Sequence, residues 1–542
     1  MNRREFVYGS AAGALLVACG GAKPQPAPAA GPAGTEEWLV EQSIDDLGKL
    51  MASGARTSRE ITNAYLFRIN HYDELIHSVI EVNKDAEGIA EAMDAERRAG
   101  KVRGPLHGIP VLVKDNIDTA DRMQTTAGSL ALVGAKPARD AAVVAKLRAA
   151  GAVLLGKTNL SEWANIRSTR STSGWSGRGG QTKNPYALDR NPCGSSSGSG
   201  AATAASLCTV AIGTETDGSI LCPSSTCNLV GIKPTVGLVS RAGIIPIAHS
   251  QDTAGPMARS VRDAALLLAA IAGAPQGDDR DPATAAAKIT AYLPSGDVKG
   301  LRIGVVRSMF GGHPEQDQLC DAAIAALKAA GVEVVDPVVV PAWPSGDADP
   351  EMPVLLYELK ADLDRYLATA NARDGVTSLA EVIAFNKAHA AQEMPYFGQE
   401  LFEKAQAMGP LTDKAYLDAR AKCLELARGG IDGAMDSHKL DALVAPTAAP
   451  AWLNDLVLGD HIAGGSTQMA AVAGYPSITV PVGFTRGLPV GLSIWGRAWT
   501  EALIIRIAAA VEGAVHARRA PAFAATADLA AATDCGHDCA SR

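Results

Sequence analysis

The sequence predicts an α/β fold in which helices cover a mixed, mostly parallel central sheet. Short apolar runs typical of buried strands alternate along the chain with segments whose apolar residues recur at helical spacing. Of the 542 residues, 47% are hydrophobic and 20% are charged, which is typical of a globular protein rather than a disordered or fibrous one. The length allows several domains, but one large α/β unit accounts for the pattern equally well.

Strand and helix signals alternate from about residue 57 onward. Thr57 and Glu60 have the spacing of a capping box, and the apolar residues after them recur at helical intervals. The continuous apolar run Ile109–Val113 is typical of a buried strand. A helical pattern then ends at Gly151, and Val153–Leu155 is predicted to form the next strand.

The same alternation continues in the second half of the chain. The segments TVAIGTE and GLRIGVVRSM are predicted strands, and a helix from about Glu315 leads to a further strand in GVEVVDPVVVP. Two late strands are expected in YPSITVPVG and LPVGLSIWG, followed by an amphipathic helix over Glu501–Glu512. Residues 350–434 look helical throughout, which suggests an insertion or a lid.

The N-terminus predicts export. It has a basic start and then a short apolar stretch, Ala11–Ala18, which is too short to span a bilayer and is typical of a signal peptide. Arg3 and Arg4 resemble a twin-arginine signal. The sequence Leu-Val-Ala-Cys ending at Cys19 resembles a bacterial lipoprotein box, in which Cys19 would carry the lipid. A plain secretory signal with a chance cysteine is the alternative.

The predicted organisation after the signal peptide of residues 1–19 is simple. Residues 20–36 are rich in Pro, Gly and Ala and are expected to form a tether. The folded domain is expected over residues 37–522, followed by a flexible tail at 523–542. No other segment looks long and apolar enough to cross a membrane. The protein is therefore expected in the periplasm of a bacterium, or tethered to a membrane through a lipid on Cys19.

Charge and composition restrict the class of partner. The formal net charge is −8, whereas a nucleic-acid-binding surface usually needs a basic face. Aromatic residues make up only 5% of the chain, so platforms for stacking bases are not indicated. The sequence thus favours a monomer that acts on a small molecule or a peptide, without a nucleic-acid partner.

The nine cysteines do not form the pattern of a small disulfide-rich scaffold. Near the C-terminus, Cys535 and Cys539 flank His537, but a second pair of metal ligands at suitable spacing is missing. A local disulfide or free thiols in a loose tail are the better interpretations. The states of Cys222 and Cys227 stay open.

The stretch NPCGSSSGSGAA raises the question of which serine could react. Ser196 formally matches the G-x-S-x-G pattern of a hydrolase nucleophile, but such a match arises easily in a run of Gly and Ser, and no strand precedes it. A phosphate-binding loop would need a lysine that this stretch lacks. A flexible linker is excluded because a helix and a buried strand follow directly.

A second serine lies in GTETDGSILCPSS. Gly213 is expected to end a buried strand, and Thr214–Gly218 to form a turn before Ser219. Successive backbone N–H groups in such a turn can converge on one point and stabilise a developing oxyanion. Ser219 is therefore a better candidate nucleophile than any serine of the Gly/Ser run.

Lys114 follows directly after the predicted strand Ile109–Val113. Most lysines at strand ends are solvated and have no chemical role. A lysine whose stem lies against buried structure can instead have its pKa lowered by desolvation and then act as a base.

Four segments of the chain together resemble the amidase signature family. They are HGIPVLVKDN, CGSSSGSGAA, GTETDGSI and GIKPTVGLVSRAGIIPIAHSQDTAGPMARSV. The resemblance extends from about Trp38 to Ala522 and implies a single large amidase-signature domain. It places Lys114 at the family's lysine position, Ser195 at the relay serine and Ser219 at the nucleophile. Ser219 lies 24 residues after Ser195, which is the family's own spacing.

The resemblance also implies a mechanism without a metal or an organic cofactor. Neutral Lys114 would take a proton from Ser195, which the family holds through a cis peptide bond, and Ser195 would take one from Ser219. Ser196 would support the loop. The oxyanion would be held by backbone N–H groups of Thr216, Asp217, Gly218 and Ser219.

Several departures from the general family pattern are similar to the branch of bacterial peptide amidases, which remove the C-terminal amide of peptides. These are Cys193, Ser197, Glu215, Asp217 and Leu221, together with SEWANIRS and SGWSGRGGQTKNP. A general amidase of small aliphatic or aromatic amides is the nearest alternative. The catalytic component of a tRNA-dependent amidotransferase and a non-catalytic binding protein are less favoured. The substrate pocket is expected between Trp163–Gln181 and the helical stretch.

Overall fold

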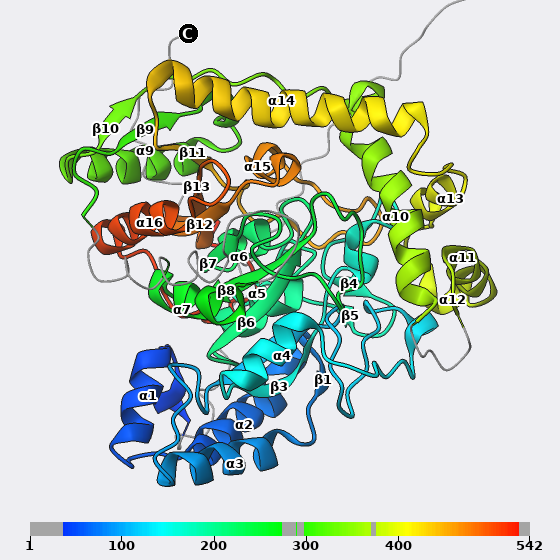
Figure 1. Cartoon of the computed structure of the whole chain (residues 1–542). Coiled ribbons are helices and arrows are strands. Elements are labelled where there is room, and N and C mark those ends of the chain that lie inside the picture. Colours follow the sequence, from blue (N-terminus) through cyan, green and yellow to red (C-terminus); the bar gives the residue numbers. More distant parts are fainter. Residues whose placement is uncertain (1–35, 274–288, 290–296, 370–375, 530–542) are drawn as a thin grey trace, which may run out of the picture. The chain divides into compact units, whose positions relative to one another are not determined.

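The computed structural model describes residues 36–273, 289, 297–369 and 376–529 (Figure 1). The chain divides into two compact units, Met1–Trp38 and Leu39–Arg542, and the fold described below is that of the second unit. The predicted signal peptide, Cys19, and Cys535, His537 and Cys539 lie outside the described residues. Within those residues, no helix is both long and apolar enough to span a membrane.

An 11-stranded mixed sheet forms the centre of this unit. In spatial order its strands are β1 (Val79–Val82), β3 (Val153–Thr158), β2 (Pro110–Lys114), β6 (Val210–Glu215), β8 (Thr253–Ala258), β7 (Val230–Lys233), β12 (Ser477–Thr485), β13 (Leu488–Trp495), β11 (Ala442–Pro446), β9 (Arg302–Val305) and β10 (Glu333–Val335). A separate two-stranded sheet pairs β4 (Trp175–Ser176) with β5 (Gly180–Gln181). The α/β class and the mixed sheet predicted from the sequence are confirmed.

The prediction that the sheet is mostly parallel is wrong. Parallel pairing is confined to two blocks, β3–β2–β6 and β11–β9–β10. Every pairing between these blocks is antiparallel, and so is the edge pair β1–β3. The tight turn at Arg486 and Gly487 makes β12 and β13 a hairpin, and hairpin strands can only be antiparallel. Alternation of helices and strands along the chain does not reveal which strands become neighbours.

The helices begin and end largely where local sequence signals place them. In the capping box, the Thr57 side chain accepts from Glu60 N, and the Glu60 carboxylate accepts from Thr57 N. The helices are α1 (Ile44–Ala52), α2 (Ser58–Ile76), α3 (Ala86–Arg98), α4 (Ala142–Ala149), α5 (Ser197–Ala204), α6 (Leu221–Thr226), α7 (Val261–Ile271), α9 (Pro314–Ala329), α10 (Glu351–Leu367), α11 (Leu379–Ala388), α12 (Ala390–Glu393), α13 (Glu400–Gln406), α14 (Lys414–His438), α15 (Gln468–Ala473) and α16 (Glu501–Val515).

Helices α10–α13 stand together on one side of the unit (Figure 1). Apolar residues of α10, α11 and α13 share a buried cluster with the loop after β3, where the Trp163 ring meets the Phe402 ring edge to face at 5.7 Å. Full burial of each such large apolar side chain stabilises the folded state by roughly 2–3 kcal/mol. These helices therefore fix the loop around residues 163–166, in which Ala164, Asn165 and Ile166 line a cavity.

Candidate active site

Two neighbouring strands and two helices bring the candidate residues to one edge of the sheet. Strands β2 and β6 pair in parallel, so their carboxyl ends, at Lys114 and Glu215, meet at the same edge. Helix α5 begins directly after Ser196, and helix α6 begins shortly after Ser219. Residues that are far apart in sequence thus converge because the strand order places their segments side by side. Strand β6 runs to Glu215 rather than ending at Gly213, so the turn begins two residues later than predicted.

Lys114 is fully buried and surrounded by oxygen atoms. Its Nζ lies 2.8 Å from Ser195 Oγ, 3.0 Å from Ser196 Oγ, 2.9 Å from Thr214 Oγ1 and 3.3 Å from Thr214 O. Burial lowers the pKa of Lys114 from 10.5 to about 7, although the carboxylates of Glu215 and Asp252 act in the opposite direction. A large fraction of Lys114 is therefore neutral near neutral pH.

The hydrogen bonds around Lys114 indicate which neighbouring oxygens can donate a proton to the neutral amine. Ser196 Oγ donates to Thr214 O at 3.0 Å, so towards Lys114 it acts as an acceptor. The carbonyl of Thr214 can only accept. Two hydroxyl groups, Ser195 Oγ and Thr214 Oγ1, are then placed to donate to the nitrogen lone pair. Of these two residues Ser195 is the one that lines the cavity, so it is the hydroxyl placed to serve as a proton relay.

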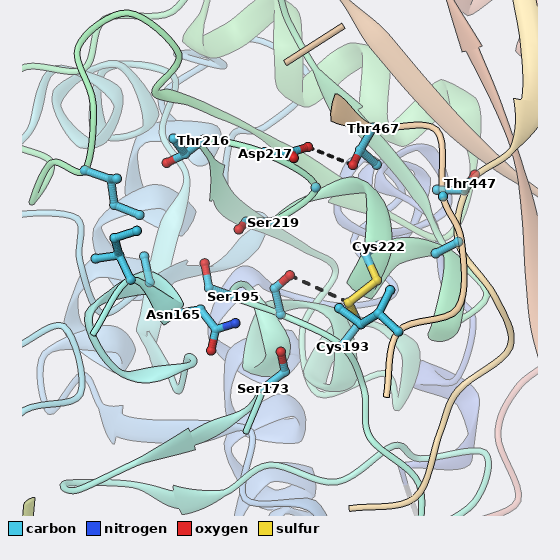
Figure 2. Close-up of a pocket in the computed structure, with 18 of the residues that line it drawn as sticks. Asn165, Ser173, Cys193, Ser195, Thr216, Asp217, Ser219, Cys222, Thr447 and Thr467 are labelled. Carbon is cyan, nitrogen blue, oxygen red and sulfur yellow. Dashed lines mark hydrogen bonds between the residues drawn. A yellow bond between two sulfur atoms is a disulfide. The ribbon is translucent and has the colours of Figure 1, made fainter. Parts of the chain in front are cut away.

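Ser195 and Ser219 both line a cavity of about 310 Å³ (Figure 2). Ser196 N donates to Ser219 O at 3.1 Å, which ties the two serine-bearing segments together. The Gly194–Ser195 peptide bond is cis, as the family resemblance implies. An open cavity beside a buried lysine and two serines can admit a substrate carbonyl next to a hydroxyl that can lose its proton.

The other serines of the Gly/Ser run are buried and hold backbone groups. Ser196 Oγ accepts from Thr214 N, Ser197 Oγ donates to Cys193 O, and Ser199 Oγ donates to Ile212 O. Ser196 is not among the residues that line the cavity. The G-x-S-x-G match at Ser196 is therefore a consequence of composition, and the geometry agrees with a supporting role for this residue.

The turn from Thr216 to Ser219 forms one wall of the cavity. Gly218 has a φ of 75°, the left-handed conformation that glycine adopts without strain. The buried Glu215 carboxylate accepts from Ile220 N at 2.7 Å and from Leu221 N at 3.0 Å, and so caps helix α6. These contacts hold the backbone of the turn in place while its residues face the cavity.

Side chains from distant segments brace the same turn. Thr467 Oγ1 donates to Asp217 Oδ1 at 2.7 Å (Figure 2). Thr216 Oγ1 donates to Asp252 Oδ1 at 2.6 Å. Burial, and secondarily the nearby Glu351 carboxylate, raises the pKa of Asp217 well above its usual range. Burial likewise raises the pKa of Asp252 to about 6.

The remaining cavity wall comes from the segments that the sequence indicated and from others that it did not. Asn165 and Ser173 lie in the predicted stretch 163–181, and Leu355 comes from α10 in the helical stretch. Sequence reasoning missed Thr447 and Thr467, which belong to a loop region without any motif. It also missed the disulfide between Cys193 and Cys222, both of which line the cavity. Cys227 is a free, buried cysteine.

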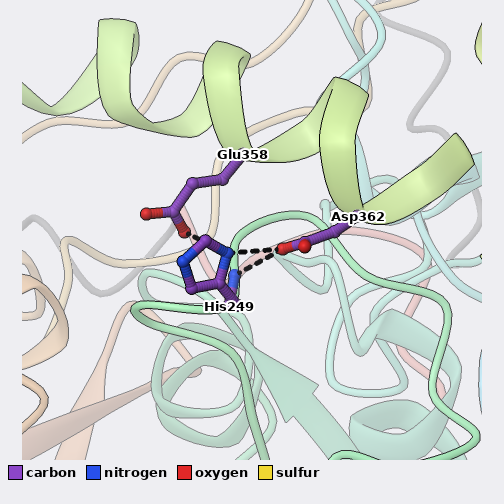
Figure 3. Close-up of side chains that lie close together, drawn as sticks. All are labelled: His249, Glu358 and Asp362. Atoms are coloured by element: carbon purple, nitrogen blue, oxygen red, sulfur yellow. Dashed lines mark hydrogen bonds and ion pairs between the residues drawn. The ribbon is translucent and has the colours of Figure 1, made fainter. Parts of the chain in front are cut away.

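His249 is not among the cavity-lining residues, and neither is His461. His249 Nδ1 lies 2.8 Å from Asp362 Oδ2 and 3.3 Å from Glu358 Oε2, both on α10 (Figure 3). The hydrogen bond to Asp362 raises the pKa of His249. The backbone N–H of His249 also donates to Asp362 Oδ2, at 3.0 Å, and Ser250 N donates to Glu358 Oε2, at 2.9 Å. The cluster thus joins α10 to the loop before β8.

Comparison with known proteins agrees with this geometry. Residues 60–505 match the model of the Amidase family. The chain belongs to this family. This amidase is an amide hydrolase. The family resemblance deduced from the sequence is confirmed.

The relatives of this amidase include enzymes of different kinds. The crystal structure of native peptide amidase from Stenotrophomonas maltophilia is 52% identical, covers 90% of this chain and 99% of its own, and superposes with a TM-score of 0.83. A probable amidase of Arabidopsis thaliana is 41% identical over 90% of this chain and 92% of the relative. A component of the glutamyl-tRNA(Gln) amidotransferase of Synechococcus is 36% identical over 88% of this chain and 93% of the relative.

Proposed function

We propose that this amidase releases ammonia from the C-terminal amide of peptides, with Ser219 as the nucleophile and Lys114 and Ser195 as its proton relay. The observation that carries the proposal is the buried Lys114, whose Nζ lies 2.8 Å from Ser195 Oγ at the wall of the cavity that also exposes Ser219. Serine attacks an amide only when a base takes its proton, and a lysine with a pKa of about 7 can be that base.

The first half of the reaction forms an acyl-enzyme. Ser195 gives its proton to Lys114 and receives one from Ser219, while Ser219 Oγ bonds to the amide carbonyl carbon. The relay then runs backward as the carbon–nitrogen bond breaks, and the returned proton leaves with ammonia. Water enters the vacated position and hydrolyses the ester through the same relay, which restores Ser219 and releases the peptide acid.

The negative charge on the carbonyl oxygen needs fixed donors. In the proposed mechanism they are backbone N–H groups of the turn Thr216–Ser219, which side chains hold from behind. One such donor contributes about 3 kcal/mol to transition-state stabilisation. Backbone N–H groups stabilise the oxyanion and the lysine acts as the base, so the proposed steps need no metal or organic cofactor.

Two observations favour a peptide amide over other substrates. The share of identical residues is 52% with the peptide amidase and 36% with the amidotransferase component. The cavity volume of about 310 Å³ also exceeds what the carboxamide group alone fills, so the residue that bears the amide can bind as well.

The proposal is tested by steady-state kinetics on the isolated protein. The values of kcat/KM are compared for a peptide amide, the same peptide as a free acid, and benzamide, with ammonia release as the readout. We expect the peptide amide to exceed benzamide by about 100-fold or more, because remote binding energy lowers the barrier. The free acid should release no ammonia.

Two results would contradict the proposal in distinguishable ways. Equal or better turnover of benzamide would identify a general amidase of small amides. Ammonia production that appears only when the other components of an amidotransferase are added would identify the catalytic component of such a complex instead.

A further inference from the structure

Three contacts join the segment that carries Ser195 to the segment that carries Ser219. The two segments run in opposite directions along these contacts. Thr226 Oγ1 donates to Pro192 O at 2.7 Å. A disulfide bonds Cys193 to Cys222. Ser196 N donates to Ser219 O at 3.1 Å. The disulfide is the covalent member of this set, and it lies between the two hydrogen bonds.

The disulfide stands immediately beside both serines. Cys193 lies two residues before Ser195, and Cys222 lies three residues after Ser219, in the first turn of α6. Both cysteines line the cavity, with exposed fractions of 2% for Cys193 and 7% for Cys222. They also pack in a small apolar cluster with Ala448 and Trp452. Figure 2 shows the sulfur–sulfur bond together with Ser195 and Ser219 among the residues that line the cavity.

The backbone at Cys193 needs support. Its φ is 60°, a left-handed conformation that residues other than glycine adopt only where neighbouring contacts hold them. Cys193 N donates to Asn191 Oδ1 at 2.8 Å, and Cys193 O accepts from Ser197 Oγ at 2.6 Å. These bonds hold the segment to itself, whereas the disulfide holds it to α6.

We propose that the Cys193–Cys222 disulfide positions Ser195 against Ser219, so that its reduction lowers turnover without unfolding the protein. Neither cysteine takes part in the chemistry. The inference rests on the roles proposed for Ser195 and Ser219, but it does not depend on which amide is the substrate. A displacement of about 1 Å between reacting groups reduces turnover by about 100-fold, so a small relaxation of either segment suffices.

The reaction that opens the bond is thiol–disulfide exchange with an external dithiol. A thiolate of the reductant attacks the more exposed sulfur, that of Cys222, and Cys193 leaves as a thiolate that takes up a proton. The second thiolate of the reductant then displaces Cys222 and closes a ring disulfide. Two electrons and two protons pass to the protein, and no other oxidant or reductant is needed. The free cysteines Cys208, Cys227, Cys320 and Cys423 are already thiols and cannot contribute.

The test compares oxidised and dithiothreitol-reduced full-length protein at a temperature well below its Tm. Mass spectrometry establishes the state of Cys193 and Cys222, and circular dichroism verifies that the fold is retained. We expect kcat to fall by about 10- to 100-fold while KM changes less than about threefold, because the lost element orients reacting groups rather than binding substrate. The rate at which a fluorophosphonate labels Ser219 should fall by a similar factor, and reoxidation should restore both rates.

Two variants make the result specific. The double variant Cys193→Ala, Cys222→Ala should show the lower kcat from the start and no further response to dithiothreitol. The control variant Cys423→Ala, in α14, should respond to dithiothreitol as the unmodified protein does.

Other outcomes are informative in separate ways. Protein proved to be reduced at Cys193 and Cys222 that keeps its kcat and its labelling rate overturns the positioning role, whether or not the double variant folds. Oxidised protein that the fluorophosphonate does not label at Ser219 contradicts the proposed nucleophile, and with it the premise of the positioning role.

Discussion

At the scale of single residues, the proposed chemistry depends on one buried lysine and two serines that come from different segments of the chain. The resemblance to the amidase signature family indicated Lys114, Ser195 and Ser219. The structure places Ser195 and Ser219 on the wall of one cavity, and Lys114 Nζ lies 2.8 Å from Ser195 Oγ. The disulfide was not predicted, because nine cysteines allow many pairings and only the fold places Cys193 beside Cys222. Sequence shows which residue types are available, whereas pairing across loops depends on the path of the backbone.

The pH dependence of hydrolysis should report the protonation of Lys114. Burial lowers the pKa of Lys114 to about 7, and only the neutral amine can accept a proton. We therefore expect kcat/KM to rise as the pH increases through about 7 and then to level off. A series of kcat/KM values between pH 5 and pH 10 checks this, and activity that falls over the same interval would falsify the role of Lys114 as the base.

Replacement of the nucleophile should abolish hydrolysis. We expect Ser219→Ala to lower kcat by about four orders of magnitude or more, because members of such a relay act as a unit. Ser199→Ala is the matched control, since this buried serine of α5 hydrogen-bonds to Ile212 O and Thr158 Oγ1 away from the cavity. The control should keep its kcat within a few-fold even if its Tm decreases. Substantial ammonia release by Ser219→Ala would require a different nucleophile.

At the scale of elements, local signals located helices and strands, but not their neighbours. The capping box at Thr57 and the buried run in β2 each depend on a few adjacent residues, and both are confirmed. The antiparallel middle of the sheet also depends on pairings between strands that are distant in sequence, such as β7 with β12 and β11 with β13. The same limitation applies to α10, whose helical character was predicted but whose contact with the His249 loop was not.

The connection between α10 and this loop leads to a prediction about substrate binding. Leu355 of α10 and Ile247 of the loop both line the cavity. We expect Asp362→Asn to raise KM more than it lowers kcat, because the change loosens the cavity wall and leaves the relay intact. Arg365→Gln is the control, since Arg365 is mostly exposed and its ion pair with Asp362 contributes little. A change in kcat alone would contradict this view of α10.

The stabilising effect of the same connection should depend on pH. The folded protein raises the pKa of His249 above its ordinary value of 6.5, mainly through the hydrogen bond to Asp362. The stabilisation is therefore fully present below about pH 6.5 and is lost as the pH rises through the folded-state pKa. The Tm difference between the unmodified protein and Asp362→Asn should accordingly be largest on the acidic side.

At the scale of the whole molecule, the family could be predicted from the sequence, but the composition of the cavity could be predicted only in part. The resemblance deduced from Trp38 to Ala522 contains the family match over residues 60–505. The cavity combines Ser173 and Leu355, which lie in the two stretches that the sequence indicated, with Thr467, which does not. No local pattern marks Thr467, because it meets the other two residues only in the folded domain.

The predicted lipid anchor at Cys19 can be tested by expressing the full-length protein in a bacterium. The expected signal peptide with Cys19 predicts that the mature protein partitions with membranes. We expect Cys19→Ser to shift the protein to the soluble fraction without change in its specific activity. Unmodified protein that is already soluble and retains its first residues by mass spectrometry would argue against export through this signal.

The burial of Lys114 has a consequence for the stability of the folded domain. A displacement of its pKa from 10.5 to about 7 corresponds to roughly 5 kcal/mol of folding free energy that is missing at acidic and neutral pH. Between pH 7 and 10.5 the unfolded chain holds the proton that the folded chain has released, so stability recovers as the pH rises through this window.

The variant Lys114→Met should make this cost visible. This variant should lose hydrolysis. The Tm of the variant minus that of the unmodified protein should be most positive near pH 6 and should decrease toward pH 10. The loss of hydrogen bonds to Ser195 and Thr214 offsets part of the gain in stability. Thermal unfolding at both pH values measures this difference, and a difference independent of pH would contradict the lowered pKa. Lys114 thus lowers the stability of the folded domain at acidic and neutral pH, although the proposed reaction requires it.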